Sequence, residues 1–198
     1  PLSVEEVMVA PALYLDYLTR LMCCPPTCGA GAAIICSKDF AKRHNIRGTV
    51  EIVGQAMATD TPATWDDPIK LVGADMTRRA AEAVFEGSGI GVSEVDVVEL
   101  HDCFTTNEVI TYEGLSLCGE GEATAFVDAG DNTYGGKFVV NPSGGLMSKG
   151  HPIGATGLAQ CYELVNQLRG TAEQRQVPNA KIGLQHNLGL GGAAVGTM

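Results

Sequence analysis

The chain alternates short apolar runs, which suit buried β-strands, with longer segments of helical periodicity. From residue 75 onward, strands are expected at 95–100, 137–140, 181–185 and 193–197, and helices at 75–87, 105–117 and 158–169. Strands that alternate with helices build layered α/β domains around a mainly parallel sheet. The length of 198 residues, 45% of them hydrophobic, suffices for one domain with its own core. The sequence therefore predicts an α/β fold in which helices flank a mixed, mainly parallel sheet.

The first 60 residues carry further signals of secondary structure. Residues 3–22 have helical spacing that Pro11 interrupts, and the apolar run 30–36 predicts a buried strand. Ser37 is expected to cap a helix that extends to about residue 44, and residues 49–57 are β-like.

Charge and hydropathy exclude several classes of protein. The chain has 13 Lys and Arg against 23 Asp and Glu, a net charge of −10. Because no basic cluster is present, this acidity argues against a surface for nucleic acids or anionic membranes. No apolar run approaches the ~18 residues of a membrane-spanning helix. Glu5 and Glu6 are atypical of a signal peptide, so the chain is not expected to be secreted.

The seven cysteines lie at irregular spacing, which favours reduced thiols in an intracellular compartment over a disulfide framework. Cys24 and Cys28 could form half of a zinc site. No second pair follows at a suitable spacing, however, and all four histidines are remote in sequence. No bound metal is therefore expected.

Glycine accounts for 25 residues, and 14 of them lie between Gly130 and Gly196. Glycines interleaved with apolar residues in this way let backbone approach a ligand or another backbone closely. This half of the chain is therefore where a site is first sought, and three loops with polar chemistry lie in or just before it.

The first loop, His101–Phe104, follows a buried strand, and open α/β sheets bind their ligands at such strand ends. His101 could donate to a developing oxyanion, and Cys103 could act as a proton donor or acceptor if its pKa were lowered. An equally good interpretation is structural, with Cys103 as a small core residue and His101 as a satisfied strand-end residue.

The second loop surrounds His151, which lies between Gly150 and Pro152 just before a helix. The N-terminus of a helix favours an anion or oxyanion there, because its first N–H groups are unpaired. A capping turn with an incidental histidine is the alternative. The third loop, His186–Gly192, is a hairpin turn on its own evidence, or a loop whose N–H groups form an oxyanion hole. It lacks the spacing of a dinucleotide-binding loop.

These loops, in this order, closely resemble the thiolase superfamily, and more narrowly its peroxisomal sterol carrier protein x type. The matching segments are 101–104, 141–145, 150–152 and 186–189, and residues 131–136 and 185–187 strengthen the narrower match. The resemblance covers about residues 18–198. It implies a five-layer αβαβα fold of two similar halves, usually working as a dimer. Residues 1–46 would then end the loop region and supply the last strand and helix of the N-terminal half, and residues 47–198 would form the C-terminal domain.

The activity that the resemblance implies is retro-Claisen cleavage of a 3-oxoacyl-CoA by CoA. This chemistry needs a thiolate nucleophile, an acid/base and two oxyanion holes. By resemblance, His151 activates the nucleophile and helps to hold the enolate oxygen, and His101 lines the same hole. Cys103 is the acid/base, and the N–H of Gly189 is an oxyanion donor. The resemblance implies coenzyme A as a substrate and no bound cofactor, and it assigns no CoA-contact residue.

Two departures from the family pattern stand out. The nucleophilic cysteine of a thiolase belongs to the N-terminal half, and no residue here matches it; Cys23 and Cys24 precede the last strand of that half. The family's usual Asp-Gly-Ala-Ala is replaced by Cys28–Gly31. The chain is therefore expected to be inactive alone.

Three hypotheses follow. The first is that the chain is part of a complete thiolase. The second is a split or degenerate thiolase-like subunit, either one whose partner supplies the nucleophile or one that acts as a lyase on steroid-type CoA esters. The third is a non-catalytic acyl-CoA or lipid-binding module. The expected partners are acyl-CoA, CoA and either a second copy or an N-terminal thiolase half, and the expected compartment is the peroxisome by resemblance, although the chain ends without a Ser-Lys-Leu-type signal.

Overall fold

A computed structural model describes residues 2–189 and 192–198. The described helices are α1 (Val4–Met8), α2 (Lys38–Arg43), α3 (Pro68–Leu71), α4 (Ala74–Ser88), α5 (Thr105–Gly114), α6 (Ala123–Asp128), α7 (Gly145–Lys149) and α8 (Thr156–Arg169). The strands are β1 (Ala12–Tyr14), β2 (Leu18–Thr19), β3 (Gln55–Thr59), β4 (Val97–Glu99), β5 (Val139–Val140), β6 (Gly183–Gly189) and β7 (Ala193–Thr197).

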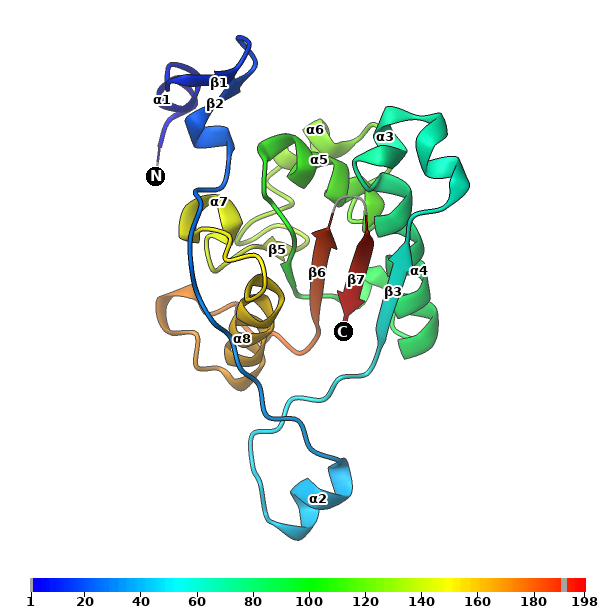
Figure 1. The fold of residues 1–198 in the computed structure, drawn as a ribbon. Coiled ribbons are helices and arrows are strands. Elements are labelled where there is room, and N and C mark those ends of the chain that lie inside the picture. The colour runs from blue at the N-terminus through cyan, green and yellow to red at the C-terminus, as the bar shows by residue number, and fades with distance from the viewer. Residues whose placement is uncertain (1, 190–191) are drawn as a thin grey trace.

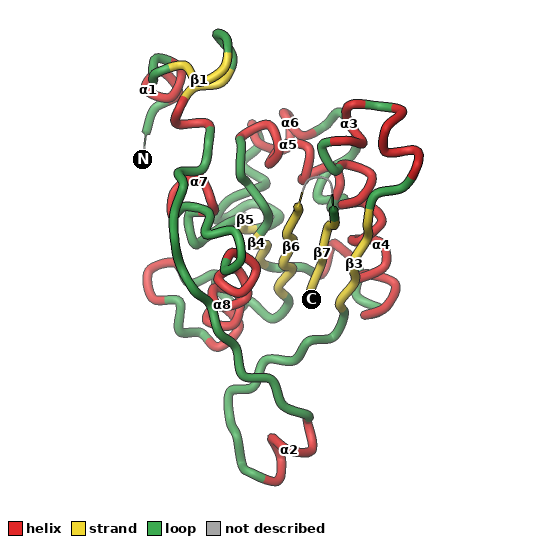
Figure 2. Tube along the Cα trace, in the orientation of Figure 1, coloured by secondary structure: helices red, strands yellow, loops and turns green. Residues whose placement is uncertain are grey.

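One sheet forms the centre of the molecule, with the strand order β3-β7-β6-β4-β5 among the described residues (Figure 1). β4 pairs in parallel with both β5 and β6, whereas β7 runs antiparallel to β6 and β3. Helices pack on both faces of this sheet (Figure 2). The expected α/β fold with a mixed sheet flanked by helices is confirmed.

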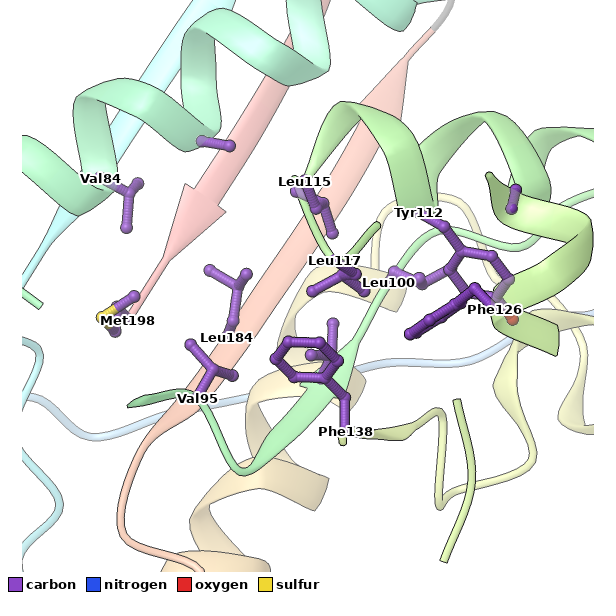
Figure 3. Close-up of a cluster of buried hydrophobic side chains, with 13 residues drawn as sticks. Val84, Val95, Leu100, Tyr112, Leu115, Leu117, Phe126, Phe138, Leu184 and Met198 are labelled. Carbon is purple, nitrogen blue, oxygen red and sulfur yellow. The ribbon is translucent and has the colours of Figure 1, made fainter. Parts of the chain in front are cut away.

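Alternation along the strands distributes side chains between the two faces, because successive residues of a strand point to opposite sides. Val98 and Leu184 belong to the main core cluster, which lies under α4, α5 and α6. Val97 instead packs with Leu164 of α8 on the other face. Figure 3 shows the main cluster, in which Tyr112 and Phe126 meet edge to face at 5.2 Å between ring centroids.

The helices expected at 75–87 and 158–169 are confirmed as α4 and α8, and a glycine follows the last turn of each. Asp75 in the first turn of α4 forms an ion pair with Arg79 at 2.8 Å, and Gly89 caps the helix with φ +70°. Gly170 closes α8 in the same left-handed conformation, at φ +72°. Glycine adopts this conformation without the steric cost that a Cβ would impose.

The helical spacing of the apolar residues at 158, 161, 162, 165 and 168 predicts that they form the buried face of α8, and this prediction was wrong. The side chains buried against the sheet are largely polar: Thr156, Gln160, Glu163, Leu164 and Gln167. Their groups are paired; for example, the amide of Gln160 donates to the carbonyl of His186 at 3.0 Å, and Arg175 contacts Glu163 at 3.1 Å. Tyr162, one of the expected core residues, is 70% exposed. Because buried polar groups are stable when they are hydrogen-bonded, periodicity of apolar residues alone does not identify the buried face here.

The strand expected at 30–36 was also wrong. This segment runs as an extended, exposed connection between the N-terminal elements and α2, and Ile34 is fully exposed (Figures 1 and 2). An extended run becomes a strand only where another strand pairs with its backbone, and no described residue does so. Ser37 caps α2 as expected, accepting from the N–H of Phe40 at 3.1 Å.

The helical spacing of residues 3–22 yields helix only in α1. After Pro11 the chain forms the β1–β2 hairpin and a 3₁₀ turn at Arg20–Met22. Pro11 ends the helical pattern because it has no N–H to donate. The boundary between 1–46 and 47–198 remains a prediction. No helix among the described residues is long and apolar enough to cross a membrane.

Candidate active site

Three parallel strands bring the polar loops together. β4, β5 and β6 point in the same direction, so their carboxyl ends meet at one edge of the sheet. The loop with His101 and Cys103 follows β4, and the segment from Asn141 to His151 follows β5. Gly189 lies at the end of β6. Segments that are far apart in sequence therefore share one edge.

A cavity of about 470 Å³ opens at this edge. All four predicted site residues line it: His101, Cys103, His151 and Gly189. Cys24, Phe104, Ile153 and Asn187 are among the other lining residues. The N-terminal segment forms part of the wall, because the N–H of Cys24 donates to the carbonyl of Cys103 at 2.9 Å and Pro26 bridges to His151.

His101 is buried, with 4% of its surface exposed, and is held from two sides. Its carbonyl accepts from the amide of Asn107 at 2.5 Å, and its Nδ1 lies 2.5 Å from the side-chain amide of Asn187. Burial lowers the pKa of His101 to about 4, against a smaller opposing effect of the hydrogen bond with Asn187. The ring is therefore neutral at physiological pH and has one N–H to donate.

His151 lies beside His101, with the two rings perpendicular and their centroids 4.8 Å apart. Its Nδ1 is 2.6 Å from the hydroxyl of Thr156, and the carbonyl of Pro152 already accepts the N–H groups of Ala155 and Thr156. The Thr156 hydroxyl also donates to that carbonyl, at 3.2 Å, so its oxygen accepts the hydrogen bond from the Nδ1–H of His151. Burial lowers the pKa of His151, so the ring is neutral and its Nε2 has a lone pair that can take a proton.

Cys103 is only partly buried and lines the cavity, which argues against the interpretation of a core residue. Burial, with smaller effects from Cys24 and Asp102, raises the pKa of its thiol to about 11. Cys103 is therefore a protonated thiol in the resting protein. It can donate a proton to a carbanion or enolate, and the thiolate that results is a strong base.

Two buried carboxylates hold the segment that carries His151, and neither was expected from the sequence. Asp102 accepts the N–H groups of Leu146 and Met147 at 2.7 and 3.3 Å, at the start of α7. Glu99 accepts the N–H and hydroxyl of Ser143 at 3.0 and 2.8 Å. Burial raises the pKa of Asp102 to about 6, and raises that of Glu99 against the opposing charge of Lys149. Their sequence positions, at the end of β4 for Glu99 and just after it for Asp102, gave no signal of these long-range contacts.

Glycines at two points allow the close approach that the loops require. Gly145 has φ +63°, and a Cβ there would collide with the carboxylate of Asp102. Gly150 has φ +95°, and the side chain of Thr27 occupies the place of its missing Cβ. The glycine-rich composition near His151 thus has a steric cause.

The third loop lies between β6 and β7. β6 and β7 are antiparallel neighbours with Gly189 opposite Ala193, as a hairpin requires, but residues 190 and 191 of the expected turn lie outside the described residues. His186 is not part of the cavity. It is fully buried on the opposite side of β6, where its Nε2 lies 3.1 Å from the hydroxyl of Thr77.

Within the part of the chain that the structure describes, no group of three or more His, Cys, Asp or Glu side chains could hold a metal ion. A second hollow lies far from the cavity around α2 and is lined by residues such as Lys38, Lys42 and Arg47. None of the predicted site residues reaches it.

Comparison with known proteins gives the family. The model of the family described as "Thiolase C-terminal domain-like" matches residues 55–198. "Sterol carrier protein 2" of Rattus norvegicus is 59% identical over 199 residues, covering 99% of this chain and 36% of the rat protein. "Benzoylsuccinyl-CoA thiolase subunit BbsB" of Thauera aromatica is 39% identical over 191 residues, covering 96% of this chain and 49% of that protein. The chain thus spans about a third to a half of the length of these relatives.

A solved structure supports the fold alone. The "Ltp2-ChsH2(DUF35) aldolase" superposes with a TM-score of 0.80 at 19% identity, covering all of this chain and 51% of the other. The match to the family model over residues 55–198 and the high identity to sterol carrier protein 2 give the assignment: the chain belongs to the thiolase family and contains its C-terminal domain.

Proposed function

We propose that the chain forms the acid/base and oxyanion part of an acyl-CoA thiolase active site. The reaction is the cleavage of a 3-oxoacyl-CoA by CoA, which yields acetyl-CoA or propionyl-CoA and a shortened acyl-CoA. One observation carries this proposal: His101, Cys103 and His151 come from separate loops and face the same cavity, with Gly189 at its rim.

The cleavage step needs a proton donor for C2 and hydrogen-bond donors for the enolate oxygen. A thiolate from another part of the enzyme attacks the ketone carbon, the bond between C2 and C3 breaks, and its electron pair becomes a thioester enolate. The thiol of Cys103 then protonates C2 to form acetyl-CoA. In the second half of the reaction, the Cys103 thiolate takes the proton of the incoming CoA thiol, whose sulfur attacks the acyl-enzyme and releases the nucleophile.

Both imidazoles can donate to the enolate. Burial keeps His101 neutral with one N–H to offer, and His151 gains an Nε2–H when it takes the proton of the nucleophilic thiol. Preorganised N–H donors of this kind stabilise charge as it develops, and removing one costs roughly 10²–10³ in kcat in other enzymes. The N–H of Gly189 is assigned to the oxygen of the ketone-derived intermediate.

The nucleophile comes from an N-terminal thiolase half. Apolar side chains that such a half would cover lie open on this chain: Ile34, Ile35, Ile153 and Tyr162 are each at least 70% exposed. An interface with the N-terminal half would remove these apolar side chains from water. The complete enzyme is a dimer with coenzyme A as substrate and no bound cofactor, and we assign it to the peroxisome from its similarity to the sterol carrier protein family.

Thiolysis of acetoacetyl-CoA tests the proposal in two proteins. The first is this chain alone, which is expected to show no activity. The second is a chimera in which this chain replaces the matching segment of rat sterol carrier protein 2, with the unaltered rat protein as reference. The chimera is expected to cleave acetoacetyl-CoA, and a Cys103→Ala chimera is expected to lose at least about 100-fold in kcat. Activity of the chain alone would contradict the need for a separate nucleophile.

A second candidate is a subunit that works with a separate polypeptide, which the name of the Thauera relative as a thiolase subunit favours. In that case the chain would gain activity when mixed with an N-terminal half expressed separately, without a covalent link. A non-catalytic acyl-CoA-binding module would instead bind CoA equally well after His101, Cys103 and His151 are changed to alanine.

A further inference from the structure

Asn187 lies on β6, between His101 and the first turn of α8. The structure places Oδ1 of its side chain 2.5 Å from Nδ1 of His101. The Nδ2 atom of the same amide points toward the first turn of α8, where it lies 3.2 Å from the position that a Cβ on Gly157 would take. Asn187 therefore connects the buried imidazole of His101 to the start of the helix that follows His151.

The orientation of this amide decides what His101 can do. A neutral imidazole carries its proton on one nitrogen, and the partner of the other nitrogen selects which one. If the amide oxygen faces Nδ1, the proton is on Nδ1, and Nε2 has only a lone pair for the cavity. If the amide nitrogen faces Nδ1, the proton is on Nε2 and can be donated to an oxyanion.

The surroundings of the far end of the amide favour the second arrangement. In the first turn of α8, a helix of 14 residues, the N–H of Thr156 is paired with Pro152, but those of Gly157 and Leu158 have no backbone partner among the described residues, and the positive end of the helix dipole lies there. The Nε2 atom of Gln185, which already donates to Gln160 at 2.9 Å, also lies on this side, 3.9 Å from the same Cβ position. An oxygen is better placed among these donors than an NH₂ group. Since the two ends of the amide have nearly the same size, a half-turn exchanges them without changing the packing.

We propose that Asn187 is a positioning residue that donates an amide N–H to Nδ1 of His101 and so directs the Nε2–H of His101 into the cavity. The ring of His151 lines the same cavity with its centroid 4.8 Å from that of His101, so the N–H of His101 meets the enolate oxygen beside His151. The chemical meaning of this arrangement rests on the proposed thiolysis, but the position of the proton does not depend on it.

The proton is located by ¹⁵N NMR of the chain with labelled histidines, of which there are only four. Variants in which each histidine is changed to glutamine assign the signals. We expect a protonated, pyrrole-type Nε2 and an unprotonated Nδ1 for His101. In Asn187→Asp the carboxylate can only accept, so a proton is expected on Nδ1. A proton on Nδ1 in the unaltered chain would overturn the proposal, whether or not the variant folds.

Kinetics of the chimera give a second readout. Asn187→Asp is expected to lower kcat for thiolysis by about 100-fold with KM changed less than about threefold, because the donor acts on the enolate. The matched control is Asn179→Asp, the same change at an exposed residue before β6, which is expected to leave kcat unchanged. Equal kcat values for the two variants would refute the role of Asn187. An inactive unaltered chimera would refute the proposed function instead, and the NMR result would still decide the tautomer.

Discussion

The fully buried His186 makes the free energy of unfolding depend on pH, and the surroundings of its ring determine how strongly. The ring has 0% exposure, Nε2 contacts the hydroxyl of Thr77, and Nδ1 has no hydrogen-bond partner among the described residues. Burial lowers the pKa of His186 to about 3, from an ordinary value of 6.5. The unfolded chain therefore binds a proton below pH 6.5 that the folded chain does not bind until about pH 3.

The sign and magnitude follow from proton linkage. Because the folded pKa is depressed, the contribution of His186 is fully present above pH 6.5 and is lost as the pH falls toward 3. Between pH 7 and pH 5 this one group removes about 2 kcal/mol from the free energy of unfolding. His101, with its pKa of about 4, removes a similar amount, and Asp102, with its pKa raised to about 6, returns about 1 kcal/mol.

Comparison of variants isolates the His186 contribution from these other groups. The free energy of unfolding is measured by urea titration with far-UV circular dichroism at pH 7, 6 and 5. In His186→Gln the loss between pH 7 and pH 5 is expected to be about 2 kcal/mol smaller than in the unaltered chain. The control His44→Gln makes the same change at an exposed histidine and so accounts for the effect of the substitution itself. Equal losses in His186→Gln and the unaltered chain would refute the reasoning.

Three other predictions concern the site and its surroundings. Gly145→Ala is expected to lower the free energy of unfolding by more than about 2 kcal/mol, because φ is +63° and a Cβ would collide with the Asp102 carboxylate at the start of α7. The control Gly121→Ala, with φ +77° and open space around the Cβ position, is expected to lower it by only about 1 kcal/mol. Equal losses would contradict the collision. At pH 8 iodoacetamide is expected to modify the exposed Cys28 well before Cys103, because a pKa of about 11 leaves Cys103 as thiolate in only about one molecule in a thousand. Peptide mass spectrometry measures the two rates, and equal rates would contradict a protonated Cys103. Tyr162→Glu is expected to leave the stability of the chain unchanged, because the side chain is 70% exposed, and to abolish binding to a separately expressed N-terminal half. Co-purification measures the binding, and unimpaired binding would show that Tyr162 is not part of the interface.

The strands and helices that position the site could be predicted where the local sequence pattern alone determines the secondary structure. The buried run before His101 and the helix after His151 have strong periodicity, and the rule that parallel strands bind ligands at their carboxyl ends then places both loops at one edge. The family resemblance, which rested on residues in these loops, is confirmed by the match over residues 55–198.

What the sequence could not predict depends on partners that are distant along the chain. The run 30–36 has the composition of a strand, yet no described strand pairs with it. The buried face of α8 is polar because Gln160 and Gln167 find acceptors and donors on β6 and on the segment after the helix. The contacts of Asp102 with α7 and of Asn187 with His101 span 44 and 86 residues, and no periodicity marks such pairs.

Proton exchange at acetyl-CoA tests the central claim most directly, because it isolates the acid/base step from the rest of the reaction. Exchange needs a base that removes a methyl proton and an oxyanion hole that stabilises the resulting enolate. In D₂O the enolate then takes up deuterium, and mass spectrometry detects the label in the acetyl group. The chimera is expected to catalyse this exchange, and Cys103→Ser is expected to slow it by at least about 100-fold while the fold and CoA binding are retained. Exchange at an undiminished rate in Cys103→Ser would contradict the assignment of Cys103 as the acid/base.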